Sequence, residues 1–394
     1  MMLRALAAIA MAVTIAGPAY AQDDTHQHPA SDAWQWGVEG NVFAGYNYQY
    51  REFTDFDEIE SQNWLMTALS KTLGGGRSHL QLVGMFSFEA FTLRDIGSPQ
   101  VFQTGETFKG APLIDYQHPH DLIMNLGGQY SRAFGPTTMT LGAYLVGPAP
   151  LGPPTFMHRP SAIGNPQAPL SHHNLDATHI SPGVVSFGID RSGFGLEAGA
   201  FHGQEPDEDR LDLDTAALDS YSVRASWADG PWQFQISGAD LKTPERISPY
   251  DATRVTASAS YFKGDERRSI AWMAAFGQNR EVFGQLEAYL VEAAKRAGKH
   301  AFYTRAENVQ KDILDAGFHP IGIAHTHRPS RVSALTLGYS REVAVRSIGA
   351  FAAGGDVTAY AVPANLKESY GSPWSFHIYL RYHGRAGTPM THHH

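Results

Sequence analysis

The chain has 394 residues, of which 43% are hydrophobic and 18% charged, and it contains no Cys. This composition argues against global disorder, and it excludes a disulfide scaffold, a Cys-ligated metal centre and a thiol nucleophile. The formal net charge of −9 disfavours nucleic acid and other polyphosphates as partners, because they bind to basic surfaces.

The first 21 residues have the pattern of a secretory signal peptide. A short positive start with Arg4 precedes an uncharged apolar run over residues 5–17, and the Ala-Tyr-Ala of residues 19–21 fits a cleavage site. This run and every later apolar run are shorter than the roughly 18 residues of a transmembrane helix. We therefore expect export with residues 1–21 removed and a short periplasmic segment over residues 22–32. An N-terminal membrane anchor is the alternative.

From residue 33 onward, apolar and polar residues alternate in segment after segment. The clearest segment is the last, in which Trp374, Phe376, Ile378, Leu380 and Tyr382 alternate with Ser375, His377, Tyr379, Arg381 and His383. A period of two places the two sets on opposite faces of a β-strand. An apolar face with aromatic residues at both ends, opposite a polar face, is typical of a transmembrane β-barrel with lipid outside and a polar lumen inside.

The alternation predicts about sixteen strands. They cover residues 33–50, 63–72, 77–90, 121–133, 137–147, 181–191, 194–203, 219–228, 231–242, 252–263, 268–279, 283–294, 299–310, 331–342, 345–361 and 373–383. Their connections alternate between short and long, except for a short one at 278–282, as expected for periplasmic turns and outer loops. Residues 281–298 also fit an amphipathic helix, which would make the strand count odd.

These features together resemble bacterial outer-membrane β-barrels, porins most of all. The resemblance covers essentially the whole mature chain and rests on the signal peptide, the alternation, the unequal connections and the aromatic-ended last strand. It implies an all-β, up-and-down antiparallel barrel over residues 33–383 in the outer membrane. It also implies contact with outer-membrane lipid and insertion by the outer-membrane assembly machinery, and it is compatible with a homotrimer. The chain departs from many family members by continuing as a His-containing tail over residues 384–394.

Many of the 19 histidines lie in the connections expected at the outer end. Neutral imidazole is the commonest metal ligand, and His-x-His presents two rings on one side of an extended chain. The candidate ligands are His118, His120, Asp121, His158, His172, His173, His179, His325 and His327. We expect no required cofactor, but a Cu or Zn ion fits these residues, copper first, since Met157 would also suit Cu(I). The alternative is that the histidines are surface residues or bond within their own loops.

The connection over residues 148–182 contains eight prolines, which disfavour both helix and strand. A loop of about 35 residues without regular structure is usually functional. In porins one long loop folds inward and narrows the channel, so we expect Arg159 and Asp176 to lie at a constriction. An external lid that covers the barrel is the alternative.

Charged residues at inward positions are expected to line the channel. The predicted lining residues are Glu39, Glu89, Asp121, Glu197, Arg224, Arg305, Glu307, His377 and Arg381. Both signs are present, which predicts a transverse field in the lumen. Acidic residues over 55–60 and 205–214 would add a mild preference for cations by raising their concentration at the mouth.

No enzyme signature accompanies the strand pattern. The chain lacks Gly-x-Ser-x-Gly and a phosphate-binding loop, and no further ligands follow residues 118–121 at the spacing of a metallohydrolase. The sequence therefore predicts a non-enzymatic, porin-like channel for small solutes or ions, with His-rich loops that handle a transition metal. The alternatives are a closed barrel that binds or sequesters metal at its surface and, further off, a barrel hydrolase.

Overall fold

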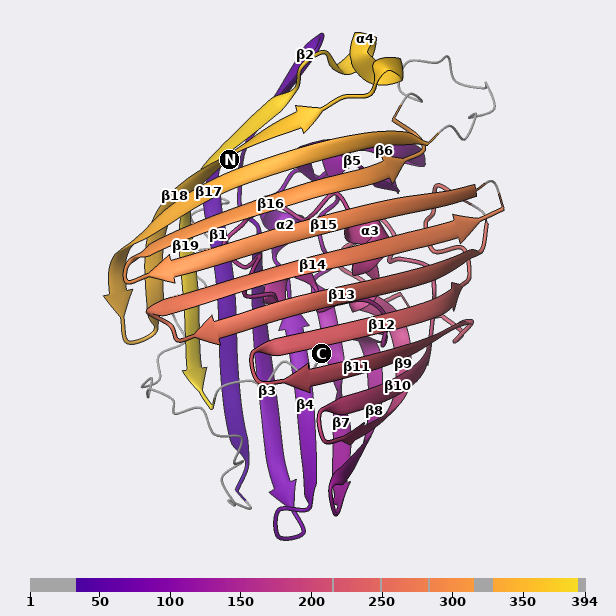
Figure 1. Ribbon diagram of the computed structural model, residues 1–394, viewed down its shortest axis with the longest axis vertical. Helices are drawn as coiled ribbons and strands as arrows, with labels where there is room; N and C mark the ends of the chain where they lie inside the picture. The colour runs from indigo at the N-terminus through magenta and orange to yellow at the C-terminus, as the bar shows by residue number, and fades with distance from the viewer. Residues whose placement is uncertain (1–32, 215, 249, 283, 315–328, 389–394) are drawn as a thin grey trace.

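A closed antiparallel β-barrel forms the body of the protein (Figure 1). The computed structural model describes residues 33–214, 216–248, 250–282, 284–314 and 329–388. The sheet follows chain order and closes where β1 (Gln35–Arg51) pairs with β19 (Trp374–Gly387). One end of β1 also pairs with β2 (Thr54–Glu60) and the other end with β3 (Asn63–Leu73), so β2 and β3 share one place in the wall. The 17 strands of the sheet therefore fill sixteen positions.

Every predicted wall strand is present. Between β3 and β19, the wall strands are β4 (Ser78–Phe86), β7 (Ile123–Phe134), β8 (Thr137–Gly147), β9 (Ser181–Arg191), β10 (Phe194–Phe201), β11 (Ser220–Asp229), β12 (Trp232–Leu241), β13 (Ala252–Gly264), β14 (Arg268–Glu281), β15 (Gly284–Ala297), β16 (His300–Lys311), β17 (Ser330–Arg346) and β18 (Gly349–Ala361). The helix alternative over residues 281–298 is wrong, because β15 pairs along its length with β14 and β16. The last strand ends at Gly387, beyond the expected residue 383.

Short turns and long connections lie at opposite ends of the barrel, as predicted, and the expected exception is the short connection between β14 and β15 at the end of the long connections. The turns at one end cover residues 74–77, 135–136, 192–193, 230–231, 265–267, 298–299 and 347–348. In the turn from β9 to β10, Ser192 and Gly193 both have positive φ (51° and 85°), which suits a two-residue hairpin turn. A Cβ on Gly193 would lie 2.3 Å from the carbonyl oxygen of Ala228, so this position requires glycine.

Side chains alternate between the two faces of the wall as the sequence predicts. In β19, Ile378 and Leu380 are 63% and 56% exposed on the outer face, whereas the intervening Tyr379 is only 4% exposed. Apolar residues such as Leu141, Leu196 and Ile236 are likewise exposed on other strands. An apolar outer face and a polar inner face suit a wall that hydrocarbon surrounds. None of the helices in the described residues is long and apolar enough to cross a membrane.

Two long connections fold into the barrel, and we name them the hairpin loop (residues 87–122) and the inward loop (residues 148–180). The hairpin loop contains α2 (Glu89–Thr92) and the separate two-stranded sheet of β5 (Ser98–Phe108) and β6 (Ala111–Gln117). The inward loop contains η1 (Phe156–His158), α3 (His172–Leu175) and η2 (Ala177–Ile180). Figure 1 shows α2 and α3 behind the front strands of the barrel. At the same end, η4 (Ala364–Leu366) and α4 (Lys367–Tyr370) precede β19.

The hairpin loop corrects the predicted ends of two strands. β4 ends at Phe86 instead of residue 90, because Glu89 accepts hydrogen bonds from the backbone N–H groups of Asn63 and His120 and the chain turns inward there. β7 begins at Ile123, two residues after Asp121. Glu89 and Asp121 therefore lie on the loop and not on the inner face of a wall strand.

Candidate functional site

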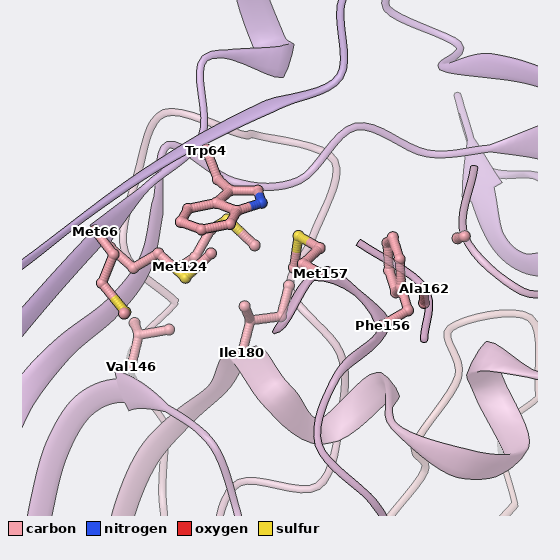
Figure 2. Packing of buried hydrophobic residues seen from close by; sticks show 10 residues of the cluster. Trp64, Met66, Met124, Val146, Phe156, Met157, Ala162 and Ile180 are labelled. Atoms are coloured by element: carbon pink, nitrogen blue, oxygen red, sulfur yellow. The ribbon is translucent and has the colours of Figure 1, made fainter. Parts of the chain in front are cut away.

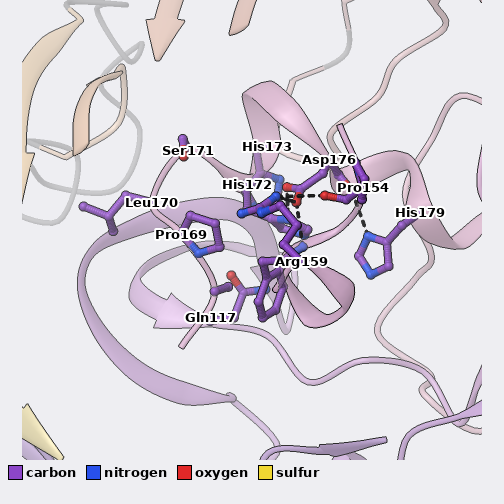
Figure 3. Close-up of polar contacts among 12 residues, drawn as sticks. Gln117, Pro154, Arg159, Pro169, Leu170, Ser171, His172, His173, Asp176 and His179 are labelled. Atoms are coloured by element: carbon purple, nitrogen blue, oxygen red, sulfur yellow. Dashed lines mark hydrogen bonds and ion pairs between the residues drawn. The ribbon is translucent and has the colours of Figure 1, made fainter. Parts of the chain in front are cut away.

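Arg159 joins the inward loop to the inner face of the wall. Its Nε lies 2.6 Å from Oε1 of Glu292 on β15, and its Nη1 lies 2.6 Å from Oδ2 of Asp176 and 2.9 Å from the carbonyl oxygen of Pro154. Figure 3 shows Arg159, Pro154 and Asp176 converging. All three charged side chains are at most 2% exposed. Such charge-assisted, buried contacts fix the loop in one position, because a lone buried charge would be costly.

Further contacts carry the inward loop across the lumen. On one side, the backbone N–H of Gly152 donates to Ser237 on β12 over 2.9 Å. On the other side, Glu307 on β16 accepts hydrogen bonds from the backbone N–H groups of Leu170 and Ser171 and from the Ser171 hydroxyl, and the Tyr379 hydroxyl donates to the carbonyl oxygen of Gly164. The inward loop thus lies inside the barrel and not over its mouth.

An apolar cluster packs the inward loop against one side of the wall (Figure 2). Phe156 and Met157 of the loop meet Trp64, Met66 and Met85 there, together with Met124, Val146, Ala162, Ala168 and Ile180. The lumen therefore has an apolar patch in addition to its polar lining. The strand pattern did not reveal this patch, since a few apolar residues on an inward face do not change the overall alternation.

Five of the predicted metal ligands come together between the two loops, and we call them the histidine cluster. His118 and His120 belong to the hairpin loop, and His172, His173 and His179 to the inward loop. Their rings follow one another in a closed circuit. The centroid distances are 6.3 Å for 118–120, 5.5 Å for 120–179, 5.2 Å for 179–172, 5.3 Å for 172–173 and 6.2 Å for 173–118. Two predicted ligands, His325 and His327, lie outside the described residues.

Hydrogen bonds orient the rings of the histidine cluster. Nδ1 of His120 lies 2.8 Å from Oε2 of Glu89, and Nδ1 of His172 lies 2.8 Å from Oδ1 of Asp176. Nδ1 of His179 donates to the carbonyl oxygen of Asp176 over 2.9 Å. In the described part of the chain, Nε2 of His120 and Nε2 of His179 are buried and make no hydrogen bond. An Nδ1 held by a carboxylate or carbonyl, with a bare Nε2, is the usual arrangement of metal-ligating histidines.

Burial keeps part of the histidine cluster neutral. It lowers the pKa of His173 and of His179 well below the usual value, and the neighbouring His172 adds to this effect in both. Neutral imidazole is the form that binds metal, so these two rings need not lose a proton on binding.

Two other predicted ligands lie apart from the histidine cluster. The His158 ring packs against Trp64, with 4.9 Å between centroids. Asp121 faces Arg210, whose Nη1 lies 3.1 Å from its Oδ1. These contacts favour structural roles for both residues.

The predicted lining residues on the wall do face inward, and most of them are paired. Glu197 pairs with Arg224, Glu39 with His383, and His377 with Asp356. Arg381 donates to Asn41 over 2.7 Å, and Arg305 donates to the carbonyl oxygen of Gln167 in the inward loop over 2.8 Å. The charges of the lumen are therefore largely matched locally, which weakens the net transverse field that the sequence suggested.

No protein-family model and no curated protein matches the chain. Solved structures do match it. An anion-selective porin from Comamonas acidovorans is 14% identical, with 89% of this chain and 100% of the porin covered and a TM-score of 0.53. OmpF of Salmonella typhi, solved with daunomycin, is 8% identical, with 88% and 97% covered and a TM-score of 0.53. The barrel is a porin-type barrel. At these identities the likeness concerns the fold alone.

Several residues of the site were missed from the sequence. Glu106, Glu205 and Glu292 all meet the inserted loops, yet Glu205 was assigned to an acidic outer loop and the other two were not considered. Glu292 lies on the inward face of β15. The alternation of inward and outward positions along that strand was therefore the feature of the sequence that could have identified it. For Glu106 and Glu205, no local pattern indicates that their loops turn into the barrel.

Proposed function

We propose that the protein is an outer-membrane, porin-like channel for small solutes or ions that handles a transition-metal ion in its lumen, copper first. In this proposal, residues 1–21 direct export and are removed, and the outer-membrane assembly machinery inserts the barrel. The exposed apolar outer face would contact lipid and, along part of its perimeter, other copies in a homotrimer.

The observation that carries the proposal is the position of the inward loop. It is tied to the inner wall by Arg159 and Glu292, and it holds three of the five histidines of the cluster within the lumen. His179 lines one pocket beside the inward loop, and His118 and His120 line another. The histidine cluster thus borders two pockets inside the barrel, where an ion that crosses the barrel would meet it.

The alternative is a closed barrel that binds metal without conducting. It is favoured by the depth to which both loops fill the lumen, since β5 is almost wholly buried. A hydrolase has less support within the described residues, because the Ser171 hydroxyl donates to Glu307 over 2.7 Å instead of to a histidine.

The test is planar-bilayer conductance of the refolded mature protein with residues 392–394 deleted. Stable unitary steps are expected without metal, and micromolar Cu(II) should block them. A His118→Gln, His173→Gln double variant should keep the steps and lose the block. Silence from protein shown to be folded would refute the channel and favour the closed barrel.

A further inference from the structure

Three loops from separate parts of the chain meet beside the histidine cluster. They contribute His118 from the hairpin loop, His173 from the inward loop and Glu205 from the connection after β10. All three residues are buried, and one ligand atom from each lies within 4.8 Å of the other two. Ligands on one metal ion, with bonds of about 2.0–2.2 Å, lie roughly 3–4 Å apart. Only a small inward movement would therefore bring these atoms into one coordination sphere.

The atoms that face each other at this point need a positive charge between them. Nδ1 of His118 donates to the carbonyl oxygen of Pro119 over 3.0 Å, so a neutral ring would present the lone pair of Nε2 on its other side. That Nε2 lies 3.0 Å from Oε1 of Glu106, a contact that is an ion pair if the ring is protonated, and neither atom has any other hydrogen-bond partner in the described residues. Two lone pairs at this distance repel unless a proton or a metal ion lies between them.

The carboxyl groups add to this demand for a cation. Oε1 of Glu205 lies 3.1 Å from Nδ1 of His173, and a Glu205 oxygen lies within 4.8 Å of a His118 nitrogen, beside Glu106. Glu245 brings a third carboxyl to within 3.9 Å of the same Nδ1. Arg210 lies 2.8 Å from Oε2 of Glu106, and the buried side chains of Arg254 and Lys311 offset part of the negative charge of Glu205 and Glu245. Buried like charges in contact are costly, and a divalent ion between them removes that cost.

The position of His173 is fixed by its neighbours. A Cβ on Gly105 of β5 would lie 2.4 Å from the imidazole carbon Cε1, so the hairpin approaches this ring as closely as a glycine allows. On the other side, Asn279 of β14 donates to the backbone carbonyl of His173 over 3.2 Å. A ligand held from both sides loses little freedom when it binds a metal.

We propose that His118, His173, Glu205 and Glu106 bind one divalent transition-metal ion, which joins the three loops across the lumen. Two imidazole nitrogens with carboxylate oxygens suit late first-row ions such as Cu(II) and Zn(II), and they do not suit Mg²⁺ or Ca²⁺, which prefer oxygen ligands alone. This metal site rests on the proposed function in one respect, namely that the ion lies inside the lumen of a channel. Within that function, the proposal identifies the metal-binding residues, and it assigns the ion a structural role in holding the three loops together.

The binding test uses the mature protein in detergent, without residues 392–394 and stripped of metal by a chelator. Titration calorimetry with Cu²⁺ and with Zn²⁺ should show one equivalent bound with submicromolar affinity. Glu205→Gln and His173→Gln should each weaken that binding by at least about tenfold, in line with losses at metal ligands and their supports. Electron paramagnetic resonance of the Cu²⁺ form should show nitrogen coupling that is reduced in the His173→Gln variant.

Two control variants separate this site from other donors. His202→Gln changes a histidine of the same connection whose Nδ1 lies 2.9 Å from Asp219, away from the cluster. Asp212→Asn changes the acidic group of Asp207, Asp212 and Asp214, a second set of neighbouring carboxylates. Both should bind metal as the parent does. Heat-dependent migration in gels and circular dichroism will show that each variant is folded.

Two results would overturn the proposal. The folded parent could fail to bind either ion, which would mean that a proton holds Glu106 and His118 together. Alternatively, Glu205→Gln and His173→Gln could both bind as the parent does, which would place the metal elsewhere. Conductance of the same preparation without metal tests the channel separately. Binding that depends on these residues in a silent barrel would refute the channel and support the metal site.

Discussion

Arg159 offers the sharpest test of how the lumen is organised. Arg159→Ala removes contacts to two buried carboxylates, Glu292 and Asp176, and to the carbonyl of Pro154. Removing one partner of such a buried network costs about 3–5 kcal/mol, because the buried carboxylates lose their nearest cation and keep only Arg305 and His172 as charged neighbours. At 1.4 kcal/mol for each factor of ten, the population of undocked inward loop should rise by roughly two to four orders of magnitude.

The wall should survive this change, because its backbone ladder does not involve the arginine side chain. We expect faster protease cleavage within residues 148–180, larger and noisier conductance steps, and little change in the temperature at which the barrel unfolds in gels. Arg224→Ala is the matched control, since that arginine also faces the lumen but makes a single 3.3 Å contact with the loop, at the carbonyl of Gly152.

A compensating pair completes the test. Arg159→Met combined with Glu292→Gln removes both charges of this buried pair. Arg305, which lies 3.4 Å from Glu292, keeps the carbonyl oxygen of Gln167 as its partner, and Asp176 keeps His172 and the backbone N–H of Phe156. The double variant should therefore recover part of the protection lost in Arg159→Ala. Equal cleavage rates in the parent and in Arg159→Ala would refute the conclusion that this network holds the loop.

Three further predictions concern the outer face, the apolar cluster and the hairpin loop. Ile378→Arg places a charge on the exposed outer face of β19 and should destabilise the barrel folded in lipid vesicles by about 2–4 kcal/mol. Leu213→Arg, on a loop, should not destabilise it. Equal effects of the two changes would contradict a lipid-facing wall. Phe156→Ala should weaken docking of the inward loop by about 3–5 kcal/mol, and proteolysis of residues 148–180 should become faster. Phe53→Ala, at an exposed site, is the control. Equal cleavage rates in the two variants would contradict the packing in Figure 2. Burial raises the pKa of Asp115 on β6 to about 6 against the effect of Arg51, so its contribution to stability is full below pH ~4 and lost as the pH rises through about 6, by about 3 kcal/mol. Hydrogen exchange of the Phe102 amide, which donates to Asp115, corrected for intrinsic rates, should show this loss of protection between pH 4 and 7 in the parent and not in Asp115→Asn; protection that grows with pH would reverse the sign.

The wall could be predicted almost completely because its signal is local. Alternation within a single strand determines which side chains face outward, as the exposed Ile378 and the buried Tyr379 show. The bilayer requires apolar side chains on the outer face, and the lumen allows polar side chains on the inner face. The ambiguity over residues 281–298 arose because Leu286, Tyr289 and Leu290 fit a helical face as well as a strand. Pairing with both neighbouring strands settles it, and pairing is not a local property.

The site could be predicted only in part. The histidines were identified by residue type and spacing, but their partners come from distant segments, such as Glu292, which lies 133 residues from Arg159. The acidic run after residue 204 indicates solvent exposure by composition, yet Glu205 at its start is buried beside His173. Which loop turns inward depends on contacts across the lumen, and a single sequence does not reveal such contacts.

The filled lumen has a consequence for how the barrel must assemble. The inward loop is synthesised before β15, β16 and β19, yet its partners Glu292, Glu307 and Tyr379 lie on those strands. Arg159 and Asp176 can pair within the loop, but Arg159 lacks its second carboxylate, Glu292, until the second half of the chain is in place. Pairing of β1 with β19 closes the barrel around the two inserted loops, which are still in contact with water when the first strands pair. Contacts between residues so distant in sequence form slowly, and docking of the loops should be the final step, completed only after the ring has closed.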